Sequence, residues 1–190
     1  MALQEGVHTE TCFVSISIAS GSDVEFAART TSVNIDQGDK DIDQIATLSG
    51  GRLVVKIPQG ITSITLEGHC ADIDSTAGTG YSQMFQAGTW DTSEPLTQVA
   101  TRERDLFRVA FLWTDDPAAT SASATTAAST NSYRWYAKDC YCTSCKPSFT
   151  DGRLKFTLQF KVPAFDTAGT ALITEDSGDA TALAALGAYT

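Results

Sequence analysis

Hydrophobic and polar residues alternate with a period of two along several stretches of this chain. In the clearest stretch, apolar residues at positions 154, 156, 158, 160 and 162 alternate with polar residues from Lys155 to Lys161. The same pattern recurs at 12–18, 33–36 and 62–70, and Gly or Pro residues lie between these stretches. Such alternation predicts antiparallel β-strands that bury one face.

Two turns interrupt the strand-rich region between residues 32 and 70. Pro58-Gln59-Gly60 separates the apolar run 52–57 from the alternating run 62–70, which predicts that these two runs pair as a hairpin. Upstream, the apolar residues at 42, 45 and 48 have loose helical spacing, but the segment is short and ends at Gly50. We therefore expect an extended connection or a single turn there.

Three further segments complete the expected fold. Along 104–113 both alternating faces contain apolar residues, which predicts a strand covered on both sides. Tyr81 and Phe85 are spaced for a short amphipathic helix within 77–89, and 177–189 combines small residues with helix propensity. The fold class that we expect is mainly β: one domain over 1–190, an antiparallel β-sandwich or flattened barrel with one short helix, a long hairpin loop and an extended or helical C-terminal arm at 164–190.

Residues 117–130 read PAATSASATTAAST and contain neither a charge nor a large apolar side chain. A segment of this composition buries little apolar surface, so we predict a mobile loop between two strands. Loops of this length are usually functional or ordered by a partner. A tolerated insertion is the alternative.

The net charge of −10 and the pI near 4.5 argue against a protein that grips nucleic acid through a basic patch. An acidic surface repels phosphates instead. No apolar run approaches the roughly 20 residues that span a bilayer, so no membrane partner is expected. The N-terminus lacks the pattern of a signal peptide, so we expect the protein to begin in the cytoplasm.

Several patterned turns carry a resemblance to a known family. The series GDKDIDQI, SGGRLV, IPQG and SITLEG, followed later by FLWTD and TDGRLKFTLQFKVPAFD, resembles the tail tube proteins (major tail proteins) of long-tailed viruses of bacteria and archaea. The resemblance extends from about residue 30 to the C-terminus.

The resemblance implies a structural virion protein and no enzyme. Six copies would form a ring, and stacked rings would form the tail tube, assembled in the host cytoplasm and located in the virion tail. The implied partners are other copies of the chain, terminator, baseplate or tape-measure proteins, and genomic DNA that passes through a negative lumen without specific binding. Ring contacts would come from 117–130 or from the acidic turn at 37–48, together with the termini.

A C-x-C-x-x-C spacing joins Cys140, Cys142 and Cys145. This cysteine cluster is not part of the resemblance to tail tube proteins. Three thiolates at this spacing can converge on a structural zinc ion, with a fourth ligand from Cys12, Cys70, His69 or His8. A disulfide, Cys142–Cys145 or Cys140–Cys145, and free thiols are the alternatives. No other cofactor is expected.

The aspartates at 36, 39, 41 and 43 lack the spacing and the closing Glu of a calcium loop. We interpret them as a solvated turn or as a ring contact matched by Arg29, Arg52 or the arginines at 102–108. No nucleophile motif accompanies His8 or His69. The alternative to a tube subunit is a β-sandwich binding module, a receptor-binding or carbohydrate-binding accessory domain, stabilised by zinc; its aromatic residues, among them Trp113 and Trp135, would line the binding face.

Overall fold

The computed structural model describes residues 11–18, 24–25, 30–56, 58–69, 105–178, 181–187 and 189. Every regular element in these ranges is a β-strand, so the predicted mainly β class is confirmed. The strands are β1 (Thr11–Ile18), β2 (Val24–Glu25), β3 (Thr30–Asp36), β4 (Ile42–Ala46), β5 (Arg52–Lys56), β6 (Thr62–His69), β7 (Leu106–Thr114), β8 (Ser132–Thr150), β9 (Arg153–Val162) and β10 (Ile173–Gly178). None of the described residues forms a helix that is long and apolar enough to cross a membrane.

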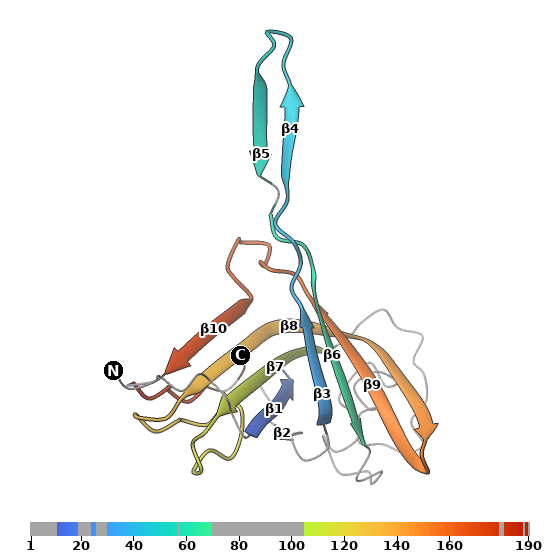
Figure 1. Ribbon diagram of the computed structural model, residues 1–190, viewed down its shortest axis with the longest axis vertical. Helices are drawn as coiled ribbons and strands as arrows, with labels where there is room; N and C mark the ends of the chain where they lie inside the picture. Colours follow the sequence, from blue (N-terminus) through green and yellow to red (C-terminus); the bar gives the residue numbers. More distant parts are fainter. Residues whose placement is uncertain are drawn as a thin grey trace, which may run out of the picture.

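Eight strands form one antiparallel sheet in the order β2-β1-β7-β8-β9-β6-β3, and β10 joins it along β8 (Figure 1). The long strand β8 organises the sheet. Its first half pairs with β7 and with β10, and its second half pairs with β9. The turn from β8 to β9 consists of Asp151 and Gly152, both with positive φ, as the Asp-Gly sequence favours in a two-residue hairpin.

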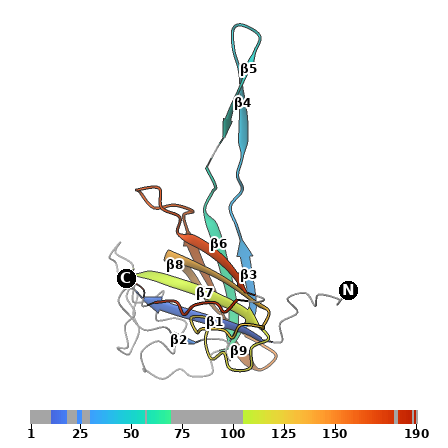
Figure 2. The same ribbon diagram turned by 90° about the vertical axis from the view of Figure 1, so that its left-hand side faces the viewer.

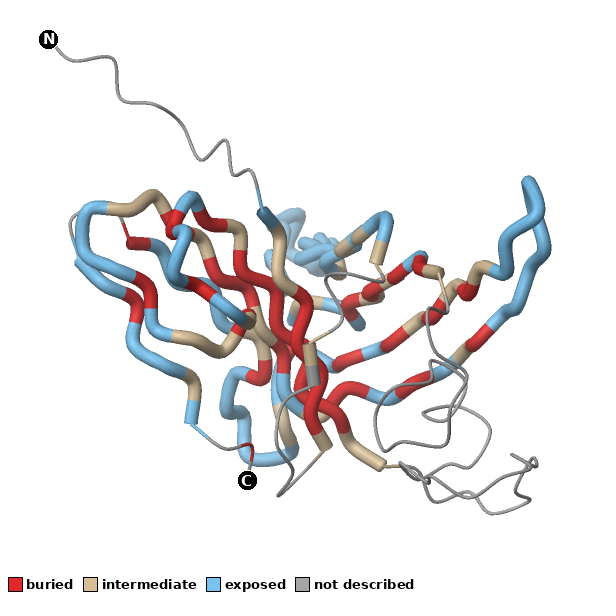
Figure 3. Tube along the Cα trace, turned by 90° about the horizontal axis from the view of Figure 1, so that it is seen from below, coloured by how far each residue is buried: buried red, intermediate tan, exposed pale blue. Residues whose placement is uncertain are grey.

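The sheet folds over on itself, so that both of its halves contribute to one hydrophobic core (Figure 3). Val14, Phe111 and Trp135 come from one half, and Leu66 and Phe160 come from the other. The alternation predicted for 154–162 is confirmed from Phe156 onward, where every second side chain is buried. The two ends of the sheet stay unpaired with each other, so the structure is an open, folded sheet and no closed barrel.

A second apolar layer covers the outer face of β7. Ala110 and Leu112 pack there against Ala119, Ala122 and Leu183, which come from the loop after β7 and from the C-terminal segment. The prediction that the strand at 104–113 is covered on both sides is therefore confirmed. The loop at 117–130, predicted to be mobile, lies close against the sheet, because its small side chains permit the approach.

The C-terminal segment is extended where the structure describes it. Residues 173–178 form β10, and 181–187 run without helix along the loop, with which they exchange backbone hydrogen bonds. The helical alternative for the C-terminal arm is thus wrong for these residues. Pairing with the sheet and the loop outweighs the modest helix propensity of the alanines.

Strands β4 and β5 pair only with each other and project from the sheet along the long axis of the molecule (Figures 1 and 2). The predicted hairpin between 52–57 and 62–70 is therefore wrong: β5 returns along β4, and β6 pairs with β3 and β9. The predicted connection at 42–48 is in fact the outgoing strand.

At the base of the projection, the Gly60 amide donates to the Asp39 carbonyl (3.0 Å), and a Cβ on Gly38 would lie 2.4 Å from the carbonyl carbon of Gly60. Only glycine fits this crossing.

The short helix predicted within 77–89 lies outside the described residues, as do Cys70, His8, Arg29 and Trp90.

Candidate assembly surfaces

The three cysteines predicted as zinc ligands are buried in the main core. A bulge between Cys142 and Ser144 turns both Cys142 and Cys145 inward, next to Cys140 on the same strand. Cys140 is a free thiol, and burial raises its pKa far above its ordinary value. Zinc binds thiolates, which this environment disfavours. In the part of the chain that the structure describes, no three Cys, His, Asp or Glu side chains are grouped to hold a metal ion. Since Cys70 and His8 lie outside that part, the zinc prediction stays untested.

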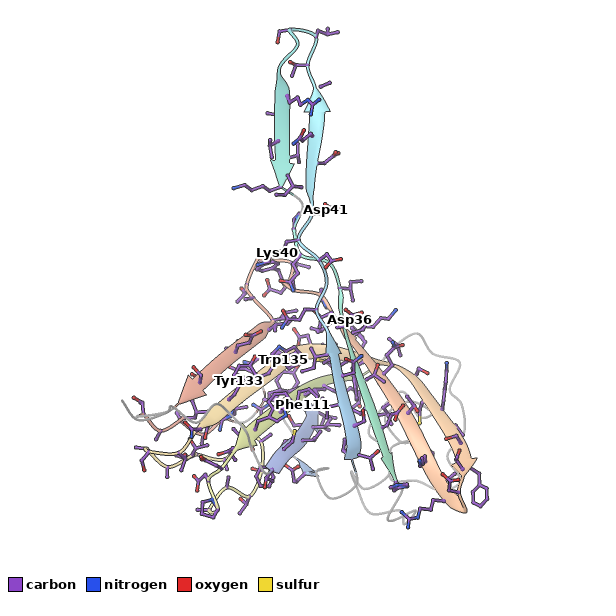
Figure 4. All side chains as sticks on the ribbon, viewed as in Figure 1. Asp36, Lys40, Asp41, Phe111, Tyr133 and Trp135 are labelled. Atoms are coloured by element: carbon purple, nitrogen blue, oxygen red, sulfur yellow. The ribbon has the colours of Figure 1, made fainter. Side chains whose placement is uncertain are left out.

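The aromatic residues of β7 and β8 form a row inside the fold rather than an open binding face (Figure 4). Phe111 lies with its ring centroid 5.9 Å from that of Trp113 and 5.8 Å from that of Trp135. Tyr133 extends the row beyond Trp113, at 5.6 Å. Phe111 and Trp135 are fully buried, so the row is chiefly core packing.

A cavity of about 210 Å³ lies where the two ends of the sheet approach each other. Val14 and Cys12 of β1, Trp113 of β7 and residues 30–33 of β3 line it. Among the described residues that line it, Cys12 is the one titratable side chain, and burial, with a smaller effect of Glu25, raises the pKa of this thiol to about 11. Such a thiol stays protonated at neutral pH and is a poor nucleophile. The described lining residues therefore do not include the acid–base pair that hydrolytic chemistry requires.

Among the described strands, the sheet has two ends. At one end, β3 pairs only with β6, and along 32–36 its other side has no strand partner among the described residues. At the opposite end, β2 covers only two residues of β1. Unpaired backbone groups along an edge are a template for pairing with another chain.

The projecting hairpin exposes apolar side chains on both of its faces. Ile45, Leu53 and Val55 share one face, and Ile42 and Val54 share the other, because directly paired residues point to the same side. The exposed fractions are 61% for Ile42, 49% for Ile45, 110% for Leu48, 57% for Leu53, 53% for Val54 and 37% for Val55. An isolated two-stranded hairpin is marginally stable in water. The sequence patterns did not predict this projecting hairpin, although the Gly50-Gly51 turn between two apolar runs was a usable signal.

The acidic residues predicted as a solvated turn lie along the base of this hairpin, where Figure 4 labels Asp36, Lys40 and Asp41. The carboxylates of Asp41 and Asp43 accept hydrogen bonds from the next backbone amide in the chain, at 2.7 and 2.8 Å. All four aspartates are exposed. The base of the hairpin therefore presents a negative surface.

One sheet face is polar over four adjacent strands. The register aligns Asn34 of β3, Thr65 of β6 and Gln159 of β9, and Ser144 of β8 lies opposite Gln159. The charged members of this face are Lys146 of β8, Arg153, Lys155 and Lys161 of β9, Glu67 of β6 and Asp36 of β3. It is a mixed polar surface and not an acidic one.

No protein-family model matches the chain, and no curated protein matches its sequence. Solved structures do match in fold. A chain of the sheath/tube terminator of an extracellular contractile injection system, PVC, in the extended state superposes with a TM-score of 0.55 at 13% identity, over 92% of this chain and 99% of that chain. A chain of the PVC sheath-tube complex gives a TM-score of 0.52 at 13% identity, over 86% and 88%. A chain of the six-fold symmetrised baseplate of the anti-feeding prophage gives 0.51 at 11% identity, over 92% and 97%.

These likenesses show the fold. The chain has the mainly β fold of chains found in contractile injection systems, which are phage-tail-like particles, and the predicted resemblance to tail tube proteins is confirmed at the level of fold.

Proposed function

We propose that this chain is a structural subunit of a phage-like tail, a tube or tube-terminator protein that works by self-assembly and catalyses no reaction. The observation that carries the proposal is the exposed apolar hairpin β4–β5 on a fold shared with tube-associated proteins. An apolar projection of this kind is stable and soluble only when a partner covers it.

The open sheet ends supply the lateral contact of a ring. In this proposal β3 of one subunit lies beside the β1–β2 end of its neighbour, so that ring closure removes the free edges. Six subunits per ring follow the predicted resemblance, and the baseplate that shares the fold is six-fold symmetrised. Further partners are the terminator, baseplate and tape-measure proteins of the tail, which is assembled in the host cytoplasm.

The polar face of β3, β6, β9 and β8 is the proposed channel lining, because its exposed side chains are polar. Its four bases, Lys146, Arg153, Lys155 and Lys161, outnumber Glu67 and Asp36, so this lining is weakly basic where the resemblance implied a negative lumen.

Electron microscopy of the purified protein at rising concentration, in low and in high salt, tests the proposal. Rings or tubes of uniform diameter are the expected result. Particles that stay monomeric or trimeric at every concentration would contradict it and favour the binding-module alternative.

A further inference from the structure

We propose that the tip of the β8–β9 hairpin, residues 146–155, is the docking surface for the β4–β5 hairpin of a second copy of this chain. The proposal rests on the proposed function as a self-assembling subunit. It names the surface on one subunit that receives the hairpin of a subunit in the next ring. It differs from the sequence-based expectation, which placed the matching charges on Arg29, Arg52 and the arginines at 102–108.

An exposed apolar pair lies at this tip. Phe149 and Leu154 are direct cross-strand partners, with exposed fractions of 75% and 39%. Leu154 lies on the same face as Phe156, the first buried residue of β9, because alternate residues of a strand share a face. The apolar row of the core thus continues past the end of the core into solvent.

The other face of the same tip is basic. Lys146 pairs with Thr157, Lys155 with Ser148 and Arg153 with Thr150, which places the three cations on one side of the two strands. With Asp151 in the turn, residues 146–155 contain three bases and one acid, a net charge of +2. The base of the β4–β5 hairpin, which comprises residues 36–43 and Lys56 opposite Ile42, contains four acids and two bases, a net charge of −2.

The two surfaces therefore match in both respects that matter for association. Each combines exposed aliphatic or aromatic side chains with charge, and the charges are opposite in sign. Charge complementarity selects a second copy as the occupant, since that copy presents the acidic, apolar counterpart.

The two surfaces lie at opposite ends of the long axis in both ribbon views, with β4–β5 at one end and the β8–β9 turn at the other (Figures 1 and 2). One molecule cannot bring its own hairpin to its own tip. A contact between unlike surfaces at opposite ends is head-to-tail, and repetition of such a contact adds copies along one axis. This geometry is that of stacked rings, whereas lateral closure uses the sheet edges.

A charge exchange tests the pairing. The acid-to-base variant combines Asp39→Lys, Asp41→Lys and Asp43→Lys, and the base-to-acid variant combines Lys146→Glu, Arg153→Glu and Lys155→Glu. In each variant alone, the two surfaces carry charges of the same sign and repel each other. The concentration at which stacking begins should therefore rise roughly tenfold or more. Light scattering and electron microscopy in low salt measure this concentration. An equimolar mixture should stack at a concentration within about twofold of that of the wild type, because each hairpin then meets an opposite charge.

Two controls keep the outcome decisive. A chain with all six substitutions should stack like the wild type, which shows that the altered surfaces still fold. Lys138→Glu changes an exposed lysine away from the β8–β9 turn and should leave stacking unchanged.

Single variants that stack like the wild type, or a mixture that stacks no better than its components, would overturn the inference and leave the proposed function intact. A wild-type chain that never assembles would overturn both.

Discussion

Two long excursions leave the sheet, and their compositions suggest the opposite of their structures. The loop Asp115–Asn131 is built of small and polar residues, yet it packs onto the outer face of β7. The hairpin that contains β4 and β5 has six exposed large apolar side chains, yet it extends away from the body. Hydrophobic composition alone therefore does not decide which segment a single chain buries.

Hydrogen bonds explain how the loop is held. The Asp116 carboxylate accepts hydrogen bonds from the amides of Ala118 (2.8 Å) and Ala127 (2.6 Å). Ala122 donates its amide to Ser15 Oγ on β1 at 2.9 Å. Each bond satisfies a backbone group that would otherwise be buried without a partner, and small side chains permit the close approach.

Buried arginines join the loop to the C-terminal segment. The Arg134 guanidinium donates to the carbonyl oxygens of Ala124 in the loop and Ala184 in the C-terminal segment, the latter at 2.5 Å. Arg108 donates to the carbonyl of Gly187 at 2.6 Å. These contacts bind two segments distant in sequence to the sheet as one outer layer. Within the described part of the chain, β4 and β5 pair only with each other and have no comparable support, which is the reason to expect an external partner.

Removal of the hairpin is the change with the largest expected effect on function. Replacement of residues 40–59 by Asn-Gly, which favours a two-residue turn, joins β3 to β6 directly. Stacking should be abolished, while the free energy of unfolding stays within about 1 kcal/mol of the wild-type value, because the hairpin contributes no residue to either core cluster. Electron microscopy and urea denaturation measure the two quantities. A shortened chain that still forms tubes would break the distinction between the two excursions.

Loss of the Arg134 clamp should have the largest effect on stability. Arg134 is only 1% exposed. Arg134→Met keeps much of the side-chain volume but leaves two carbonyl oxygens without their charged donor. We expect a loss of about 3 kcal/mol in the free energy of unfolding. Hydrogen exchange should also speed up in the loop and in residues 181–187. Lys138→Met, at an exposed position on the same strand, is the matched control. Equal stability of the two variants would contradict the role of the clamp.

Asp116→Ala removes one carboxylate that satisfies two amides of the loop, without changing the sheet beneath it. A loss of about 2 kcal/mol is expected, smaller than for Arg134 because water can reach part of the freed groups. Denaturant titration measures it, with Thr125→Ala, at an exposed position of the same loop, as the comparison. If the two variants lose equal stability, the loop owes its order to packing alone.

The sequence predicted much of the sheet and little of its connections. Alternation located β1, β6, β7 and β9, since each of these strands has one face fixed by the core. The predicted pairing of 52–57 with 62–70 was wrong because the sequence Pro58-Gln59-Gly60 is typical of a tight turn. In the structure, the backbone of Gly60 instead lies close to Gly38, where the chain crosses at the base of the hairpin. That contact is not encoded locally.

The two assembly surfaces were also only partly predictable. The acidic residues at 36–43 are visible in the sequence, but their position at the base of a projection depends on β4 pairing with β5. The exposure of Phe149 could not be predicted, because the alternating run at 154–162 continues into a buried core and nothing local marks where the core ends. Similarly, small residues at 117–130 gave no sign of burial, since the donors and acceptors that hold them lie far away in sequence.

The smallest expected effect on folding comes from the hairpin's own apolar face, and it sharpens the comparison most directly. Ile45 and Leu53 are cross-strand partners on that face, and Ile35 and Ile64 are a cross-strand pair of the sheet with Ile64 fully buried. Ile45→Thr with Leu53→Thr should change the free energy of unfolding by less than about 0.5 kcal/mol, because both side chains are already in water. Ile64→Thr should cost about 2–4 kcal/mol, since it removes a buried methylene and places a hydroxyl in the core. Urea denaturation measures the free energy of unfolding of both variants, and light scattering measures their stacking. The hairpin variant should keep its stability and yet fail to stack. A hairpin variant as unstable as Ile64→Thr would mean that the projection is part of the folded core after all.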